Sequence, residues 1–521
     1  MLKRLFVFIL LLTQLSACVL TGPKPAPVSG LEWWEDAIFY EIFVRSFYDT
    51  DNNGIGDFNG VTAKLDYLQD LGITAIWLMP IHPSPSYHGY DVINYYAVNH
   101  EYGSMDDFKR LLDEAHKRDI KIIIDLVINH TSALHPFFID ANSNLDSPYR
   151  NWYVWADEWQ GNGWHQGYHG FYYGLFWDGM PDLNYNNPEV TDFANRISAH
   201  WLDEIGVDGF RVDAAKHLIE QEGQIENTLA THNWYKDYYE TYKENHPTAH
   251  TVGEVFGVGG FIAKTYQNEF DHVFNFELAS GIVNSVRGGS NTGINSALNF
   301  TLKDIDNGEY ATFLTNHDQN RVMSVLNGDQ EKARLAAFML LTLPGTPYLY
   351  YGEEIGMQGK KPDEDIRLPM QWSGEENAGL SGSRPWRSPD ANYPQVNVAL
   401  QENDSDSLLS HYRELIQLRK AHAALRTGQT ILLETGNSGV YAILRSEGDE
   451  HLLVLANLTG SAIEDYALTL NDEVFPDGAI IPKTLFGDKQ GVQATISNKR
   501  FKDYKPLGEL PPYQAFVFQL K

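Results

Sequence analysis

Three carboxylic acids stand at the ends of short apolar segments in the central part of this 521-residue chain. They are Asp213, Glu254 and Asp318, which close the segments Gly-Phe-Arg-Val-Asp213, Thr-Val-Gly-Glu254 and Phe-Leu-Thr-Asn-His-Asp318. An apolar run that stops at a charged residue is typical of a buried parallel strand. In α/β barrels the reactive groups gather at the C-terminal ends of such strands. The three segments therefore predict one site built by three strands.

The chemistry that suits these acids is the cleavage of a bond between sugars. That reaction needs one carboxylate to attack or to activate water, and one protonated acid for the leaving oxygen. Arg211 shares a strand face with Asp213, so its charge is expected to lower the pKa of this carboxyl and keep it ionised as the nucleophile. Glu254 has no cationic neighbour in the sequence, and burial is expected to keep it protonated for the acid/base role.

Asp318 follows His317, and we expect it to stabilise the positive charge that builds up at the anomeric carbon. The alternative for all three acids is a purely structural one, because aspartate and arginine on neighbouring strands often form ion pairs. The combination of three such endings with histidine and arginine beside them favours a catalytic site.

The segments around these acids alternate between apolar strands and amphipathic helices. A capping box at Ser104 and Asp107 begins one of the helices. Eight strands with helices between them predict a (β/α)8 barrel of the TIM type rather than an open sheet. The expected strands are residues 38–43, 73–78, 120–127, 207–212, 250–255, 272–276, 310–314 and 347–351.

Two stretches depart from this alternation. Residues 131–182 show no clear helical pattern and are rich in aromatic residues, which predicts a small domain inserted after strand 3. Its aromatic side chains suit both a core of its own and the stacking of sugar rings. Residues 426–521 contain short alternating runs and predict a C-terminal antiparallel β-sandwich. The barrel is then assigned residues 33–130 and 183–425.

The composition excludes some classes of function. Basic residues number 39 and acidic residues 69, for a net charge of −30. Proteins that bind nucleic acid need a basic surface, so we expect no nucleic-acid partner. A neutral substrate is compatible with this charge.

The start of the chain predicts export. Lys3 and Arg4 precede the apolar residues 5–12, which is the pattern of a signal peptide. Residues 1–17 end in Leu-Ser-Ala before Cys18, and this ending resembles the cleavage box of bacterial lipoproteins. That resemblance implies a lipid on Cys18, the single cysteine of the chain, with residues 18–32 as a tether. The protein is then anchored to the bacterial cell envelope or surface; an ordinary signal peptide and a secreted protein are the alternative.

From about residue 33 onward the chain resembles the α-amylase family, glycoside hydrolase family 13. Besides the three catalytic segments, four motifs occur in the order of that family: Gly72-Ile-Thr-Ala-Ile-Trp-Leu-Met-Pro80, Asp125-Leu-Val-Ile-Asn-His130, Met180-Pro-Asp-Leu-Asn184 and Gly345-Thr-Pro-Tyr-Leu-Tyr-Tyr-Gly-Glu-Glu354. The resemblance implies a retaining double displacement on α-glucosidic bonds. Asp213 is then the nucleophile, Glu254 the acid/base and Asp318 the stabiliser of the transition state.

The same resemblance implies residues that bind the sugars on both sides of the cleaved bond. At the cleavage point these are His88, Tyr90, His130, Arg211 and His317. Asp363 and Arg367 match the family's pair on the non-reducing side. Lys216 and His217 match the residues on the leaving-group side.

Calcium is the expected cofactor. Residues 49–57 carry oxygen side chains at alternating positions, with glycines between them, which suits a hard cation. The stretch is not the loop of a helix-loop-helix calcium protein, because its twelfth position is Gly60, which cannot supply the carboxylate. It resembles the first βα loop of oligo-1,6-glucosidases and related amylases. By that resemblance the ligands are Asp49, Asp51, Asn53, the Ile55 carbonyl and Asp57. A second calcium site, by resemblance to the general amylase site, is formed by Asn129, Asp182 and the His217 carbonyl.

The motifs leave the specificity open between groups of the family. Met180-Pro-Asp-Leu-Asn184 is intermediate between the forms of oligo-1,6-glucosidases and neopullulanases. Lys216 and His217 favour an α-amylase that cleaves internal α-1,4 bonds of starch and maltooligosaccharides, with some transglycosylation or pullulan activity. The segment beginning at Arg367 is closer to an exo-acting α-glucosidase or oligo-1,6-glucosidase. A non-enzymatic alternative is a membrane-anchored glycan-binding protein or a transporter subunit. We expect a monomer whose partner is its α-glucan substrate.

Overall fold

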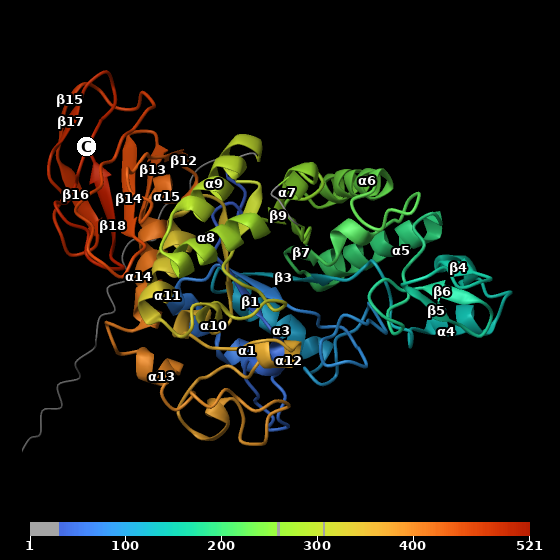
Figure 1. The fold of residues 1–521 in the computed structure, drawn as a ribbon. Coiled ribbons are helices and arrows are strands. Elements are labelled where there is room, and N and C mark those ends of the chain that lie inside the picture. Colours follow the sequence, from blue (N-terminus) through green and yellow to red (C-terminus); the bar gives the residue numbers. More distant parts are fainter. Residues whose placement is uncertain (1–30, 258–260, 306–307) are drawn as a thin grey trace, which may run out of the picture.

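The structure is a computed structural model that describes residues 31–257, 261–305 and 308–521 (Figure 1). Within these residues eight parallel strands form a closed barrel in the order β1-β11-β10-β9-β8-β7-β3-β2. This confirms the predicted TIM barrel, because every predicted strand overlaps one that is observed. The barrel strands are β1 (Phe39–Ile42), β2 (Ala75–Leu78), β3 (Lys121–Leu126), β7 (Gly209–Val212), β8 (His250–Gly253), β9 (His272–Phe274), β10 (Tyr310–Thr312) and β11 (Thr346–Tyr350).

The interior of the barrel changes from apolar to polar along the strands. Side chains alternate along a strand, so Phe39 and Glu41 of β1 both point inward. Phe39 lies in an apolar cluster that also contains Val252 and Tyr348. One layer higher, towards the C-terminal ends of the strands, the inward residues include Glu41 and Arg211, both at most 2% exposed. This polar layer forms the floor on which the site is built.

Helices cover the outer face of the barrel and bury its outward strand residues in the largest core cluster. The capping box predicted at Ser104 and Asp107 is present at the start of α3. The helices around the barrel are α1 (Phe58–Ala63), α2 (Leu65–Leu71), α3 (Met105–His116), α5 (Pro188–Ala199), α6 (Leu229–Asn245), α7 (Phe261–Thr265), α8 (Phe276–Gly288), α9 (Thr292–Asp304), α10 (Val322–Val325), α11 (Gln330–Thr342), α12 (Asp363–Ile366), α13 (Val398–Gln401), α14 (Leu408–Ala421) and α15 (Ala423–Arg426).

The segment between β3 and α5 forms a separate lobe at the right of Figure 1. It holds α4 (Pro136–Ser143) and a small antiparallel sheet in the order β4-β6-β5. The strands are β4 (Trp155–Ala156), β5 (Trp164–Gln166) and β6 (Phe171–Tyr173). Aromatic rings pack against one another between the helix and the sheet, as Phe138 does with Tyr153 and Tyr172. We call this lobe, residues 131–182, the inserted segment.

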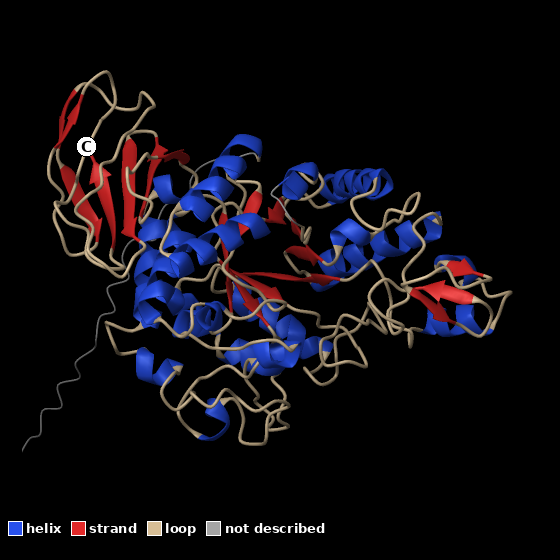
Figure 2. Ribbon diagram, in the orientation of Figure 1, coloured by secondary structure: helices blue, strands red, loops and turns tan. Residues whose placement is uncertain are grey.

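The C-terminal part forms an antiparallel five-stranded sheet in the order β12-β13-β14-β18-β16, with a two-stranded sheet β15-β17 beside it (Figure 2). Both faces of the larger sheet are buried. Ile443 and Val454 pack into the main core on the barrel side, whereas Leu444 and Leu455 belong to a second core on the other side. The strands are β12 (Gln429–Leu432), β13 (Val440–Glu447), β14 (Glu450–Asn457), β15 (Gly478–Ile480), β16 (Pro482–Phe486), β17 (Ala494–Ile496) and β18 (Ala515–Leu520).

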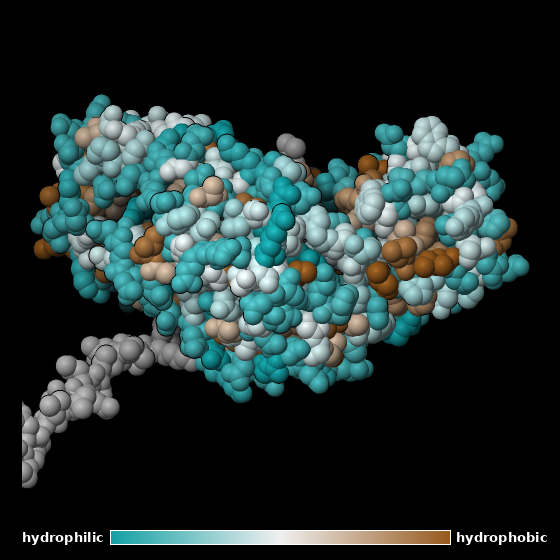
Figure 3. All heavy atoms as spheres, turned by 90° about the horizontal axis from the view of Figure 1, so that it is seen from below, coloured by the Kyte–Doolittle hydropathy of each residue, from teal (hydrophilic) through white to brown (hydrophobic). Residues whose placement is uncertain are grey.

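The predicted signal peptide, Cys18 and most of the predicted tether lie outside the described residues. In the part of the chain that is described, none of the helices is both long and apolar enough to cross a bilayer. The face seen in Figure 3 is mainly hydrophilic, and its largest group of hydrophobic residues lies at the end occupied by the inserted segment. There Leu134, Ile139 and Leu145 are each more than half exposed.

Candidate active site

The three carboxylic acids predicted from the sequence line a single cavity of about 540 Å³. Asp213 follows β7 directly, Glu254 follows β8, and Asp318 lies in the loop between β10 and α10. The predicted sugar-binding residues His88, Tyr90, His130, Lys216, His217, Asp363 and Arg367 line the same cavity. The remaining two, Arg211 and His317, are buried beneath it.

One guanidinium group joins two of the three acids, Asp213 and Glu254. Nη1 of Arg211 lies 2.7 Å from Oδ1 of Asp213, and Nη2 lies 2.7 Å from Oε2 of Glu254. Nη1 also lies 2.5 Å from Oδ1 of Asp125, the inward residue of β3. Because Asp213 and Glu254 bond to two nitrogens of the same planar group, their carboxylates face the cavity side by side.

Glu254 is held through one of its two oxygens. Oε2 accepts a hydrogen bond of 3.2 Å from the backbone N–H of Ala214, in addition to its contact with Arg211. Ala214 has a φ of 47°, an unusual backbone conformation for a residue with a side chain, directly after Asp213. Since both donors bind Oε2, a proton carried by this acid would sit on Oε1. Burial raises the pKa of Glu254, the direction that the sequence predicted.

Asp213 departs from the sequence-based expectation. The predicted contact with Arg211 is present, but the pKa of Asp213 is raised rather than lowered, chiefly by burial. Arg211 does lower this pKa, and the charge of Asp318 raises it further. The expectation was wrong because it assigned Arg211 to one carboxylate, whereas the guanidinium is shared among three. Burial likewise raises the pKa of Asp125, to about 7, although its contact with Arg211 is the shortest of the three.

Asp318 has a different environment, with two cationic partners. Its Oδ2 lies 3.2 Å from Nε2 of His317, and its Oδ1 lies 2.7 Å from Nη2 of Arg367. Burial would raise the pKa of Asp318, but these two cations lower it well below its ordinary value. Asp318 is therefore an ionised carboxylate throughout the neutral range.

His317 is protonated at neutral pH. Burial favours the neutral ring, but the charges of Asp318 and Glu41 outweigh burial and raise the pKa of His317 to about 10. Nδ1 donates to Oε1 of Glu41 at 2.5 Å, and Nε2 lies 2.7 Å from the hydroxyl of Tyr90. The Tyr90 ring is stacked near His317, at 5.7 Å between centroids. The aromatic ring thus forms one wall of the cavity.

The other predicted residues surround this centre. Nε2 of His130 lies 3.1 Å from the backbone oxygen of Tyr90, and Nδ1 of His88 accepts from the Tyr90 N–H at 3.2 Å. On one side Asp363 lies 3.6 Å from Arg367. On another, Nζ of Lys216 binds Glu226 at 2.5 Å. These side chains supply polar groups around a mainly aromatic and aliphatic cavity, as a sugar site requires.

The family model described as the alpha amylase catalytic domain matches residues 41–428, most of the chain. The chain belongs to the α-amylase family. It is a glycoside hydrolase of family 13.

Members of the α-amylase family with different activities resemble the chain over most of its length. Alpha-amylase 3 of Dictyoglomus thermophilum is 41% identical over 88% of this chain and 90% of that protein. Oligo-1,6-glucosidase of Parageobacillus thermoglucosidasius is 33% identical over 82% of this chain and 90% of its own. Among solved structures, the α-amylase from H. orenii has a TM-score of 0.81 and 39% identity, covering 93% of this chain and 99% of that one.

Several residues of this family 13 cavity were not predicted from the sequence. They come from the inserted segment, from the loops after β8 and β10, and from the start of α8: Phe176, Trp177, Met180, Phe256, Phe276, Asn316 and Gln319. The density of aromatic residues in the inserted segment was a signal for two of them. Asp125 and Glu41 were also not predicted as buried partners of the site. Each is a charged residue within an expected apolar strand, and this position was a signal that could have identified it.

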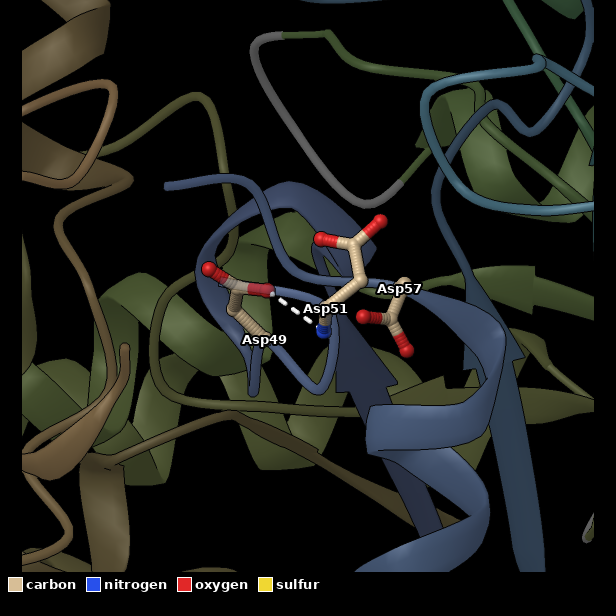
Figure 4. A group of neighbouring side chains, drawn as sticks. All are labelled: Asp49, Asp51 and Asp57. Carbon is tan, nitrogen blue, oxygen red and sulfur yellow. Dashed lines mark hydrogen bonds between the residues drawn. The ribbon is translucent and has the colours of Figure 1, made fainter. Parts of the chain in front are cut away.

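The acidic loop after β1 has the donor set that calcium requires. Single carboxylate oxygens of Asp49, Asp51 and Asp57 lie within 4.8 Å of one another. Figure 4 shows these three side chains on their loop. Asn53 is held in the same loop, with its side chain bonded to Asp51 at 3.1 Å and accepting from the N–H of Ile55 at 2.7 Å. Three like charges this close repel one another, and a divalent cation between them would remove the repulsion. The residues therefore fit the first predicted calcium site.

The second predicted site contains buried oxygens without partners. Among the described residues, Oδ1 of Asn129 and Oδ2 of Asp182 are buried and have no hydrogen-bond partner. Burial, with the charge of Glu220, raises the pKa of Asp182 well above its ordinary value. An unpartnered buried oxygen is costly, so a bound cation or water at this position would stabilise the fold. The third residue predicted for this second calcium site, His217, lies in the turn after β7. The same residue also lines the cavity.

Proposed function

We propose that the protein is an α-amylase that hydrolyses internal α-1,4-glucosidic bonds of starch and maltooligosaccharides with retention of configuration. The observation that carries this proposal is the pair of 2.7 Å contacts from the two terminal nitrogens of Arg211 to Asp213 and Glu254. This arrangement is compatible with the carboxylate separation of about 5 Å that retaining enzymes use. The 41% identity to an α-amylase supports the choice of activity within the family.

In the proposed mechanism Asp213 attacks the anomeric carbon while Glu254 donates its proton to the leaving oxygen. Arg211 is bonded to Oδ1 of Asp213, so Oδ2 is the attacking oxygen. Asp318, kept ionised by His317 and Arg367, stabilises the positive charge of the transition state. The oxygen of a water molecule then attacks the anomeric carbon, Glu254 takes a proton from that water, and the bond between the carbon and Asp213 breaks. Two inversions at the same carbon give net retention.

The products formed early from amylose test this function. An enzyme that cleaves internal bonds is expected to release a mixture of maltooligosaccharides and to shorten long chains before glucose accumulates. Chromatography of products from the first minutes, with amylose, pullulan and isomaltose as separate substrates, measures this. Glucose as the main product from the first minutes, or faster hydrolysis of isomaltose than of amylose, would instead identify an exo-acting α-glucosidase or oligo-1,6-glucosidase.

We further propose that the loop of Asp49, Asp51 and Asp57, with Asn53 and Ile55, binds a structural calcium ion. Removing calcium is expected to lower the free energy of unfolding by about 3 kcal/mol when the ion was present at 100 times its dissociation constant. The melting temperature, followed with and without a chelator, gives this change. Asp51→Asn is expected to abolish the dependence on calcium, whereas Asp70→Asn on the exposed face of α2 leaves it intact. If the chelator lowers the melting temperature of Asp51→Asn as much as that of the unchanged protein, calcium does not bind at this site.

We also propose that the protein is a lipid-anchored monomer of the bacterial cell envelope. The signal-like residues 1–17 and the following Cys18 support the anchor. Replacing Cys18 by Ser is expected to release the exported protein into the soluble fraction, and cell fractionation measures this.

A further inference from the structure

Two arginine side chains are buried where the C-terminal sheet packs against the barrel (Figure 1). Arg419 of α14 is 2% exposed and Arg445 of β13 is 0% exposed. Within the described residues, all hydrogen bonds of the two guanidinium groups go to backbone carbonyl oxygens rather than to carboxylates. A buried charge without a counter-charge is costly, so these two charges need compensation of another kind.

The end of a helix supplies part of this compensation. Together the two guanidinium groups bind four backbone oxygens at and just after the C-terminal end of α11, those of Leu341, Thr342, Leu343 and Gly345. Nη2 of Arg445 also donates to the oxygen of Gly428 at 3.1 Å. A helix C-terminus carries roughly half a negative elementary charge, which stabilises a nearby cation. That partial charge offsets only a fraction of two full positive charges.

The pKa values of both arginines reflect this excess of positive charge. Burial, together with the charge of Arg445, lowers the pKa of Arg419 to about 9, and burial lowers the pKa of Arg445 to about 10. Asp36 acts on Arg419 in the opposite direction, but its carboxylate is bonded to Arg426 at 2.7 Å. Both arginines therefore stay charged at neutral pH, and the interface keeps a net positive charge.

Four polar atoms of this interface are buried and have no hydrogen-bond partner in the part of the chain that the structure describes. One is Nε of Arg445, and the others are the hydroxyl oxygens of Tyr310, Thr430 and Tyr441. The guanidinium N–H can only donate a hydrogen bond, and each hydroxyl can donate one. Buried polar groups are rarely left without a partner, so several of them together indicate that a water molecule or an ion binds there.

The sheet brings three of these groups to one face. Thr430 of β12 lies directly opposite Arg445 of β13, so both side chains project from the same face, with Cβ atoms about 5 Å apart. Tyr441 precedes Arg445 by four residues on β13, and side chains alternate along a strand, so it shares that face. This face is directed towards the barrel, because Tyr441 packs into the main core.

Tyr310 approaches the same place from the barrel. It begins β10, and its ring rests against Gly345, where an added Cβ atom would lie 2.5 Å from Cε2 of the ring. The carbonyl oxygen of Gly345 accepts a hydrogen bond from Arg419 at 2.6 Å. Burial raises the pKa of Tyr310, and the charges of Arg445 and Arg419 oppose this rise. The hydroxyl therefore lies within the field of both guanidinium groups.

We propose that the interface between the barrel and the C-terminal sheet binds one chloride ion through five side chains, those of Tyr310, Arg419, Thr430, Tyr441 and Arg445. An anion accepts hydrogen bonds from all of these groups and supplies the negative charge that the interface lacks. A water molecule would occupy the place without supplying charge. Because core side chains are packed around this place, a monatomic ion suits it better than a phosphate or a carboxylate.

This anion site is separate from the active site. Tyr310 stands at the start of β10, whereas Asp213 and Glu254 follow the ends of β7 and β8. The two sites therefore lie at opposite ends of the barrel. We assign the anion a structural role, since it joins the barrel to the C-terminal sheet.

The first test follows the melting temperature of the full chain while sodium chloride replaces sodium gluconate at constant ionic strength and constant calcium. Chloride at 100 times its dissociation constant is expected to raise the melting temperature by about 3 °C, because only the folded chain forms the site. Arg445→Met is expected to remove this effect. Arg500→Gln is the matched control, because the Arg500 side chain is 41% exposed in the same C-terminal part, and the chloride effect is expected to persist.

The second test removes one hydroxyl and keeps the ring. The Tyr441 hydroxyl has no partner among the described residues, so without an anion Tyr441→Phe is expected to keep or raise the melting temperature. With the anion, the variant is expected to need about tenfold more chloride for the same stabilisation. Tyr466→Phe is the matched control, because its hydroxyl donates to the Leu507 oxygen at 2.6 Å. Its melting temperature is expected to fall equally at every chloride concentration.

The third test locates the ion in crystals of the unchanged protein soaked in sodium bromide. An anomalous peak is expected in contact with Nε of Arg445 and the hydroxyl of Tyr441. A peak at this place without any response of the melting temperature would identify an ion that dialysis does not remove, and would still support the site.

Two results would overturn the inference. The first is a water molecule or no density at this place, together with a melting temperature that does not respond to chloride. The second is a chloride effect that persists in Arg445→Met and is unchanged in Tyr441→Phe, since the anion would then bind elsewhere. Neither result bears on the proposed cleavage of glucans, which depends on groups at the other end of the barrel.

Discussion

Asp213→Asn is expected to lower kcat on starch by a factor on the order of 10⁴ to 10⁶, as the loss of a covalent nucleophile does in other hydrolases. An amide at this position cannot form the glycosyl ester, although it preserves the shape of the side chain. The defect is expected to persist with α-maltosyl fluoride, because a better leaving group does not replace a missing nucleophile. Initial rates with both substrates measure the effect.

Glu254→Gln is the matched comparison for Asp213→Asn. Its loss on starch is expected to be about 10²- to 10⁴-fold. With α-maltosyl fluoride the loss is expected to be much smaller, because fluoride leaves without a proton. Equal rescue of both variants by the fluoride would contradict the assignment of these two roles.

The pH dependence separates the same two groups. Burial raises the pKa of Glu254, so the proton donor keeps its proton to a higher pH than a free glutamic acid, and activity falls as the pH rises through that pKa. Burial also raises the pKa of Asp213, so activity falls on the acidic side as this nucleophile becomes protonated. In Glu254→Gln with α-maltosyl fluoride, the alkaline fall of kcat/KM is expected to disappear and the acidic fall to remain.

Arg211→Met is expected to lower the free energy of unfolding by about 3–5 kcal/mol near neutral pH. The guanidinium is 1% exposed and contacts Asp125, Asp213 and Glu254, which would be left buried without a counter-charge. The folded-state pKa values of these acids would rise further, so the deficit is expected to grow as the pH rises from about 4 to 8. Urea denaturation at several pH values measures it.

A surface ion pair provides the control for Arg211→Met. Arg387 contacts Asp365 with both side chains about 40% exposed, so Arg387→Ala is expected to change stability by at most about 1 kcal/mol. An Arg211→Met variant as stable as Arg387→Ala would show that the three carboxyl groups do not depend on the guanidinium.

The fold was largely predictable because local patterns determine it. Each barrel strand is an apolar run, and the C-terminal strands differ from them by alternating over short distances. Contacts within one strand were also predictable, as for Arg211 and Asp213. The contact of Arg211 with Glu254 was not, because it depends on which strand lies beside β7 and in what register.

The pKa values of the carboxyl groups in the site could not be predicted from the sequence alone. The pKa of Asp213 depends on burial and on how many carboxylates share one cation, and neither is visible in a linear pattern. The sequence likewise showed that the inserted segment is rich in aromatic residues, but it did not show which of these residues line the cavity. Phe176 and Trp177 line the cavity because the end of the inserted segment returns to the barrel, where Asp182 forms a bridge with His130.

The strand order of the C-terminal sheet has a consequence for biosynthesis. The strand β18 lies between β14 and β16, although it follows both in the chain. During translation these two strands emerge from the ribosome with a vacant place between them, and their N–H and C=O groups stay unpaired until residues 515–520 are made. The five-stranded sheet is therefore completed only after the whole catalytic barrel has been synthesised, because β11, the last barrel strand, ends at Tyr350.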